Sequence, residues 1–198
     1  DRVLLWNGGI TEWNDVETLL HAMARLGRTR PEVKLVFMGV SHPDMVFGPT
    51  SGVNKLAYEL SEELGLKDRN VFILNGWVPY EEIDNYLAEA DASVCLGYEN
   101  IESRFAFRTR YVDLFRARVP LLCTQGDVLA NRVHDAPMGL TVPERDIDAV
   151  VDGITRLLDD RDFVATCKAN MATMATELSW DSVVQPLVDF CVSGESYA

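Results

Sequence analysis

The sequence lacks the features by which a metal site, a membrane span or a dinucleotide fold is usually recognised. Its 198 residues include only three histidines and four cysteines, with no C-x-x-C pair, so we expect no metal site. No apolar run approaches the roughly 20 residues of a bilayer-spanning helix, and we expect no insertion into a membrane. A G-x-G-x-x-G turn and a Gly-Lys-Ser/Thr phosphate loop are also missing, which disfavours the folds that depend on them.

Basic residues are scarce as well. Lysines and arginines number 18 against 31 aspartates and glutamates, which gives a formal net charge of −13. Broad binding to nucleic acid needs a face rich in Lys and Arg, and an anionic membrane surface attracts basic segments. We therefore expect no nucleic acid and no membrane surface as partner. Any local group of arginines stands out against this acidic background.

Apolar sequence is abundant. Hydrophobic residues make up 47% of the chain, which is enough for one continuous core. Cys95 and Cys123 lie inside apolar, strand-like runs, where a free cysteine behaves as a small core residue. This pattern predicts reduced thiols and a cytoplasmic protein.

Short β-rich runs alternate with longer helical segments almost throughout. Such alternation builds a parallel sheet with helices on both faces, whose strands are nearly continuously apolar. We predict an α/β fold, a Rossmann-like doubly wound parallel sheet of about six strands with a helical C-terminal tail. Residues 1–160 would form the α/β domain, and helices in 161–198 would pack on the same domain. The expected strands are 3–6, 33–38, 71–74, 92–96, 121–123 and 140–142, and the first helix, 15–28, would be capped by Asn14.

Ligands of open α/β sheets bind beyond the carboxyl ends of the strands, so the residues after each strand are the candidates. Gly8 and Gly9 follow the first strand and let a phosphate approach the backbone, although they also suit a simple tight turn. Trp77 and Val78 follow the third strand and offer an apolar surface to a nucleobase, although an aromatic residue there more often packs in the core. Gly126, after the fifth strand, is a weaker candidate for an anion or sugar contact.

The segment after the fourth strand is the richest in charged groups. Arg104, Arg108 and Arg110 fall within seven residues. One guanidinium group can donate two parallel hydrogen bonds to two oxygens of a phosphate. A helix is expected near 109–117. If it begins as early as Phe107, it would add the positive end of its dipole, and Asp113 on its inner turns would accept ribose hydroxyls.

A second interpretation of the same segment is structural. Its arginines would then form surface ion pairs with neighbouring carboxylates, namely Glu99, Glu102 and Asp113.

These pieces, in this order, resemble the C-terminal, donor-binding domain of retaining GT-B-fold glycosyltransferases of the glycosyl transferases group 1 type. The resemblance covers nearly the whole chain. It is carried by the Gly-Gly turn, PEVKLVFMG, NVFILNGWVPYEEIDNYLAEADASVCL, DLFRARVPLLCTQGD and GLTVPERDIDAVVDGITRLLDD.

The resemblance implies a function for the whole chain. It implies that residues 1–160 bind a nucleoside diphosphate sugar as donor, without a cofactor, for transfer to a polysaccharide or lipid-linked glycan. It also implies that the N-terminal acceptor-binding domain is missing from this chain and that the isolated domain is inactive alone.

The resemblance also assigns roles to single residues. Gly8 and Gly9 would lie beside the donor diphosphate. The helix N-terminus at Arg108 and Thr109 would meet phosphate, and Asp113 would hold the ribose.

Two departures from the family pattern change the remaining roles. The first glutamate of the family's E-x7-E pair is replaced by Phe105, so Glu102 is the nearest substitute for a donor-sugar contact. The basic residues that commonly follow the Gly-Gly turn are missing, so Arg108 and Arg110 would supply that charge. Arg108, Arg110 and Glu102 are therefore the candidate catalytic residues.

Three other functions fit parts of the pattern. An NAD-dependent oxidoreductase domain needs G-x-G-x-x-G and a ribose-binding acid about 20 residues later, and both are missing. A sugar-nucleotide epimerase or a phosphorylase on the same scaffold is the second, and an epimerase would carry further acid–base groups. A non-catalytic nucleotide-sugar-binding module is favoured by the broken glutamate pair.

Overall fold

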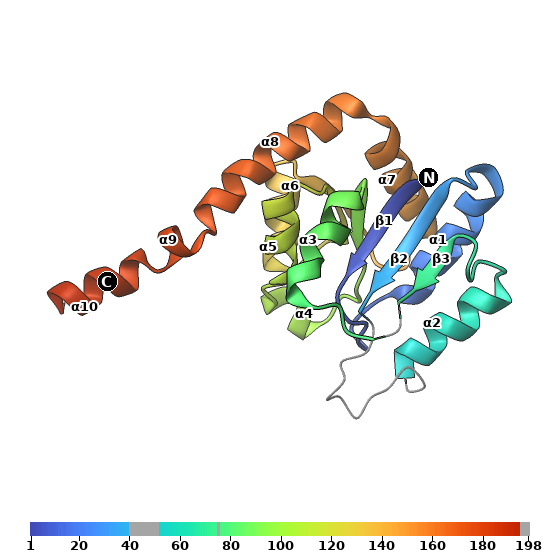
Figure 1. Ribbon diagram of the computed structural model, residues 1–198, viewed down its shortest axis with the longest axis horizontal. Coiled ribbons are helices and arrows are strands. Elements are labelled where there is room, and N and C mark those ends of the chain that lie inside the picture. Colours follow the sequence, from blue (N-terminus) through green and yellow to red (C-terminus); the bar gives the residue numbers. More distant parts are fainter. Residues whose placement is uncertain (40–51, 75, 195–198) are drawn as a thin grey trace.

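The computed structural model describes residues 1–39, 52–74 and 76–194, and its centre is one six-stranded sheet (Figure 1). Neighbouring strands pair in parallel, in the order β3-β2-β1-β4-β5-β6. The strands are β1 Arg2–Asn7, β2 Val33–Met38, β3 Val71–Ile73, β4 Ala92–Cys95, β5 Leu121–Thr124 and β6 Gly139–Val142. The predicted Rossmann-like sheet of about six strands is confirmed.

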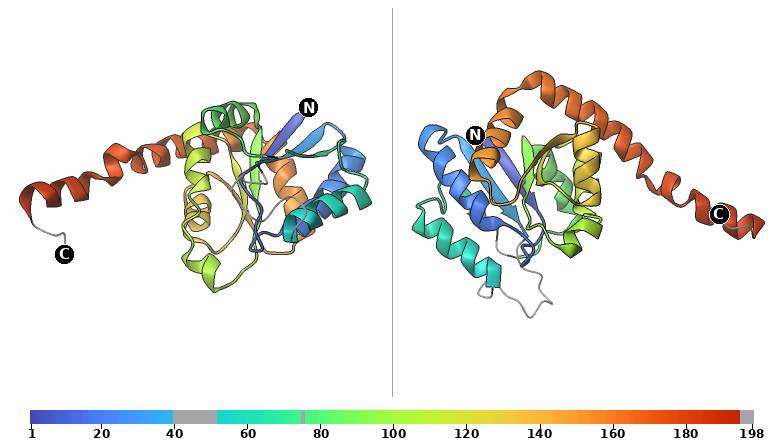
Figure 2. Two further views of the ribbon diagram at one scale, coloured as in Figure 1. Left: turned by 60° about the horizontal axis from the view of Figure 1, so that its bottom comes forward. Right: turned by 180° about the vertical axis from the view of Figure 1, so that it is seen from behind.

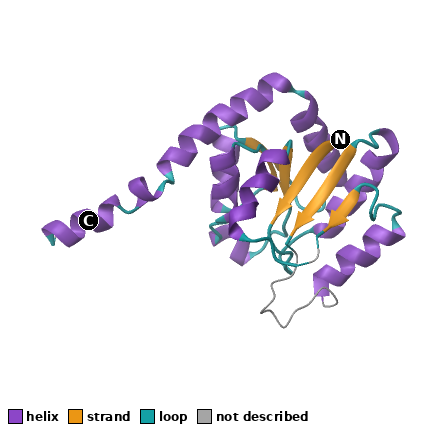
Figure 3. Cartoon of the chain, viewed as in Figure 1, coloured by secondary structure: helices purple, strands orange, loops and turns teal. Residues whose placement is uncertain are grey.

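Helices cover both faces of this sheet (Figure 3). One apolar cluster joins α1, α2 and α7 to one face, and a second joins α3, α5, α6 and α8 to the other. The bounds are α1 Val16–Thr29, α2 Gly52–Glu63, α3 Tyr80–Glu89, α4 Ile101–Phe105, α5 Arg110–Ala117, α6 Val128–Asp135, α7 Ile147–Asp159 and α8 Arg161–Glu177. Every residue of β4 and β5 is buried, because both faces of these strands are covered.

The predicted cap of the first helix is wrong by one residue. Asp15, not Asn14, caps α1, and its Oδ1 accepts a hydrogen bond from the Thr18 amide at 3.1 Å. Asn14 instead bridges to Gly97 after β4, and its Oδ1 accepts hydrogen bonds from the Thr11 amide and hydroxyl. The pairing with a distant strand decides between two equally good capping residues.

The helix predicted near 109–117 is confirmed as α5, but the earlier start considered for it, near Phe107, is wrong. A separate short helix, α4, spans Ile101–Phe105, and Asn100 and Ser103 close its start with a reciprocal capping box. The backbone becomes extended at Ala106, with φ −67° and ψ 131°. Helix α5 then begins only at Arg110, so Arg108 lies in the turn between the two helices and Arg110 is the first residue of α5.

The C-terminal helices divide into two parts. Helix α8 packs against α5 and α7, while α9 (Trp180–Val183) and α10 (Gln185–Ser193) lead away from the sheet (Figures 1 and 2). Neither α9 nor α10 has a buried residue. Their exposed large apolar side chains are Trp180, Val183, Leu187, Val188, Phe190 and Val192. None of the helices in the described part of the chain is long and apolar enough to cross a membrane.

Candidate functional site

The candidate site lies where the strand order reverses, between β1 and β4. From these neighbours the chain leaves to opposite faces of the sheet, which opens a crevice at their carboxyl ends. Two backbone hydrogen bonds join the loops that follow these strands. The Asp15 amide donates to the Leu96 carbonyl at 3.1 Å, and the Tyr98 amide donates to the Trp13 carbonyl at 3.0 Å.

Arg110 lies directly against the turn that follows β1. Its Cζ is 3.5 Å from the position that a Cβ on Gly8 would take, and its Nη2 donates to the Gly9 carbonyl at 3.4 Å. The Asn7 amide Nδ2 donates to the Arg110 carbonyl at 3.0 Å. Gly8 has φ +124°, a conformation that residues with a Cβ rarely adopt. The structure therefore brings the Gly8–Gly9 turn and the first residue of α5 together.

The guanidinium of Arg110 has a terminal nitrogen, Nη1, whose N–H donors are not used within the described part of the chain. Its Nη1 is buried and finds no partner among the residues that the structure describes. A buried, unpaired donor on a charged group is costly, and a phosphate oxygen is the type of acceptor that arginine binds best. A small movement of the Arg110 side chain would expose this donor to an anion above the Gly8–Gly9 turn.

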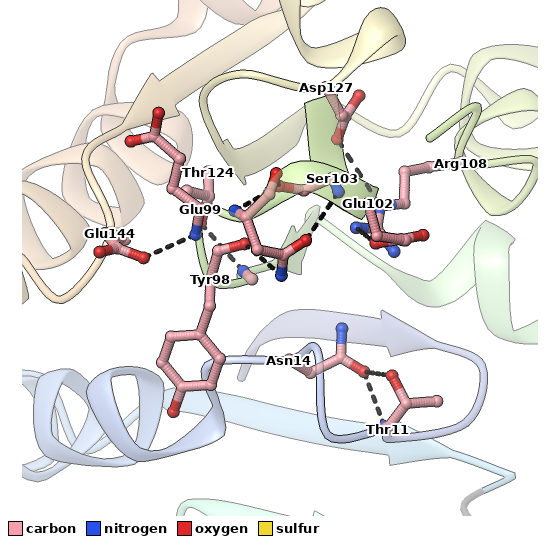
Figure 4. A network of polar contacts seen from close by, with 12 residues as sticks. Thr11, Asn14, Tyr98, Glu99, Glu102, Ser103, Arg108, Thr124, Asp127 and Glu144 are labelled. Atoms are coloured by element: carbon pink, nitrogen blue, oxygen red, sulfur yellow. Dashed lines mark hydrogen bonds and ion pairs between the residues drawn. The ribbon is translucent and has the colours of Figure 1, made fainter. Parts of the chain in front are cut away.

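Arg108 differs from Arg110 because it already contacts two carboxylates. Its Nη2 is 3.2 Å from Glu102 Oε2, and its Nε is 3.9 Å from Asp127 Oδ2 (Figure 4). The predicted surface ion pairs of this segment thus include the pair of Arg108 with Glu102. This prediction does not describe Arg110, whose side chain contacts the Gly9 carbonyl.

Asp127 is a residue of this site that sequence reasoning missed. It caps α6 by accepting the Ala130 amide at 2.7 Å, and its Oδ2 accepts the Tyr111 hydroxyl at 3.4 Å. Burial raises the pKa of its carboxyl, against the opposing effects of the Ala130 amide and Arg108. An aspartate directly after Gly126 and before a helical run is a signal that could have found it.

Two hollows open at this edge of the sheet. The smaller, about 20 Å³, lies between Arg108, Tyr111, Thr124 and Asp127, and it has room for about one water molecule. It is therefore too small to enclose a sugar ring. The larger, about 340 Å³, lies on the α1 side and is lined by Asp15, Glu17, Thr18, His21, Tyr98, Arg145 and Ile147. It combines the guanidinium of Arg145 with the carboxylates of Asp15 and Glu17.

Asp113 and Thr109 belong to α5. Asp113 lies one turn into the helix, and its Oδ1 is 3.9 Å from Arg116 Nη2. Burial raises the pKa of Asp113, whereas Arg116 lowers it. Thr109 occupies the N-cap position, but its exposed side chain makes no capping hydrogen bond. The ribose and phosphate roles of these two residues stay predictions.

The remaining candidates follow β3 and β5. Trp77 is 56% exposed, and Val78 is buried with its amide close to Gly39, the residue that follows β2. Gly126 has φ +110° and open space around its Cα. Phe105, at the position of the missing glutamate, is 81% exposed. Over the described ranges, no three His, Cys, Asp or Glu side chains group as a metal site would require.

Comparison with known proteins places this geometry in a family. The model for glycosyl transferases group 1 matches residues 1–174. A search of curated proteins gave no match.

Three solved structures share the fold at low sequence identity. WaaG, a glycosyltransferase involved in lipopolysaccharide biosynthesis, is 19% identical with a TM-score of 0.72, over 98% of this chain and 48% of its own. Alr3699/HepE from Anabaena, in complex with UDP and glucose, is 17% identical with a TM-score of 0.78, over 98% of this chain and 49% of its own. The C-terminal domain of a glycosyl transferase group 1 family protein (LpcC) from Francisella tularensis is 15% identical with a TM-score of 0.70, over 89% and 84%. The chain thus spans about half the length of WaaG and HepE.

Proposed function

The chain belongs to the glycosyl transferases group 1 family, and from that membership we propose that it is the donor-binding domain of a glycosyltransferase. The donor is a nucleoside diphosphate sugar. One observation carries the proposal: the unpaired Nη1 of Arg110 lies against the Gly8–Gly9 turn at the point where the strand order reverses. The HepE structures with UDP and with UDP-glucose support UDP as the carrier.

The proposed chemistry is stabilisation of a leaving group. When the bond between sugar and diphosphate breaks, negative charge develops on the phosphate oxygens. Arg110 would donate from Nη1 to one of these oxygens, and Arg108 lies two residues away at the same turn. Donors fixed in place before reaction stabilise such charge without reorganising. Asp113 would hold the ribose, and Trp77 and Val78 would contact the base.

We further propose that the domain works with an acceptor-binding domain across the carboxyl edge of the sheet. The coverage of WaaG and HepE by only about half supports this. The exposed apolar side chains of α9 and α10 are a candidate surface for that domain. The four free thiols suit a cytoplasmic protein, and the similarity to WaaG supports a role in polysaccharide synthesis. No resident cofactor is proposed, because the nucleotide sugar is the substrate.

One observation favours a second function, binding without transfer. Phe105 replaces an expected glutamate and points its ring into solvent at 81% exposure, so it offers no carboxylate to the sugar. A binding module and a transferase domain would both take up nucleotide. Only the transferase would release UDP from UDP-glucose when an acceptor-binding domain and an acceptor are supplied.

Isothermal titration with UDP, GDP and NAD tests the proposal. A UDP or GDP signal with no response to NAD is expected. Charged hydrogen bonds contribute about 1.5–3 kcal/mol, so Arg110→Ala should weaken the nucleotide roughly tenfold or more. Arg104→Ala is the matched control, because Arg104 is exposed in the same segment and should keep full affinity. Equal affinity of Arg110→Ala and the wild type contradicts the proposal.

A further inference from the structure

Arg108 is held by two carboxylates that differ in how firmly they are fixed. The Asp127 side chain is only 6% exposed and is anchored by the Ala130 amide and the Tyr111 hydroxyl. The Glu102 side chain is 44% exposed. The Asp127 carboxylate is therefore fixed beside Arg108, whereas the Glu102 side chain is free to rotate away from it.

The helix that carries Glu102 is held by few contacts, one of which is the hydrogen bond from the Val128 amide to the carbonyl of Ala106, directly after the helix, at 3.3 Å. Helix α4 has five residues and none of them is buried, and both Ile101 and Phe105 are about four-fifths exposed. Its capping box joins Asn100 to Ser103 within the same segment. The contact of Glu102 with Arg108 thus links α4 to the edge of the sheet (Figure 4).

The charges around Arg108 make Glu102 a competitor for an anion. Two carboxylates share one guanidinium there, while the neighbouring Arg110 has a spare donor beside the Gly8–Gly9 turn. Arg108 lies two residues before Arg110, and a diphosphate that pairs with both would meet the negative charge of Glu102 at Arg108. Glu102 is the more exposed of the two carboxylates that contact Arg108.

We propose that Glu102 is an internal placeholder for the donor phosphate: it pairs with Arg108 in the empty site and is displaced when the diphosphate binds, which releases α4. This inference rests on the proposed function. It changes the expected role of Glu102 from a sugar contact to a regulator of donor affinity. Exposed ion pairs contribute little free energy, so removal of the Glu102 charge should change donor affinity only modestly. The change should be an increase in affinity, whereas loss of a sugar contact would lower it.

Binding of UDP and UDP-glucose to Glu102→Gln, at low ionic strength, tests the sign. We expect about twofold to fivefold tighter binding of both ligands than in the wild type. Glu99→Gln is the matched control: Glu99 is also an exposed carboxylate before α4, and its contact with Glu144 is made by its backbone amide. It should bind as the wild type does. Equal affinities of the two variants, or selective weakening of UDP-glucose in Glu102→Gln, overturn the proposal.

Amide hydrogen exchange over residues 101–105 supplies a readout that needs no nucleotide. Exchange should be faster in Glu102→Gln than in Glu99→Gln, and UDP should accelerate it in the wild type. Unchanged exchange in the nucleotide-free Glu102→Gln variant also overturns the proposal. If the wild type binds no nucleotide, the proposed function fails, while exchange in the free chain still decides whether Glu102 tethers α4.

Discussion

Replacing Gly8 by alanine should damage the site through the backbone. Gly8 has φ +124°, which an alanine adopts only under strain, whereas Gly9 does not lie in this region. A residue held in such a conformation costs about 1–3 kcal/mol. A change of 1 kcal/mol lowers the Tm of a chain of this size by about 2–4 °C. The new Cβ would lie 3.5 Å from Arg110 Cζ, an ordinary contact, so backbone strain dominates over a clash.

Urea unfolding and UDP titration measure the two consequences of Gly8→Ala. Relief of the strain would rotate the turn away from Arg110, so the free energy of unfolding and the affinity for UDP should fall together. Gly9→Ala is the control for stability, because its Cβ would meet nothing within 4 Å. Its stability should stay within about 0.5 kcal/mol of the wild type. Equal stability of Gly8→Ala and Gly9→Ala would show that no backbone strain arises at Gly8.

Three further predictions concern the groups around this turn. Asn7→Ala removes the buried donor to the Arg110 carbonyl and should cost about 1–3 kcal/mol in urea unfolding; an unchanged midpoint contradicts it. Because burial raises the pKa of Asp127, its carboxyl contributes stability in acid that is lost as the pH rises through that pKa. The stability of the wild type relative to Asp127→Asn should therefore increase as the pH falls from 7 to 4, and a constant difference argues against this sign. Asp113→Asn should weaken UDP roughly tenfold and leave inorganic pyrophosphate unchanged, since Asp113 is expected to hold the ribose; equal losses for both ligands would remove that role.

The fold was predictable because the strands are buried on both faces. Strands buried on both faces are nearly continuously apolar, as in VKLVFM and ASVCL. The observed strand bounds agree with the predicted ones within two residues at each end. Helix α4 was missed because it is short and buries no apolar face, so the 3.6-residue periodicity that identifies helices is absent. Asn14 and Asp15 are equivalent caps in sequence, and only the bridge from Asn14 to Gly97 separates them.

The sequence was sufficient to predict which loops form the site, but not which of their side chains contact one another. Gly8, Gly9 and the arginines could be singled out because they follow strands that end at the same edge. The approach of Arg110 rather than Arg108 to Gly8 depends on where α5 begins, and helix starts are uncertain from sequence. Asp127 was missed because its partners, Tyr111 and Arg108, come from a segment distant in sequence.

A crystal structure of the chain with UDP tests the central claim most directly. We predict that a diphosphate oxygen lies within hydrogen-bond distance of Arg110 Nη1, above Gly8 and Gly9. Diphosphate bound elsewhere, for example in the hollow lined by His21 and Arg145, with Arg110 Nη1 still unpaired, would contradict it.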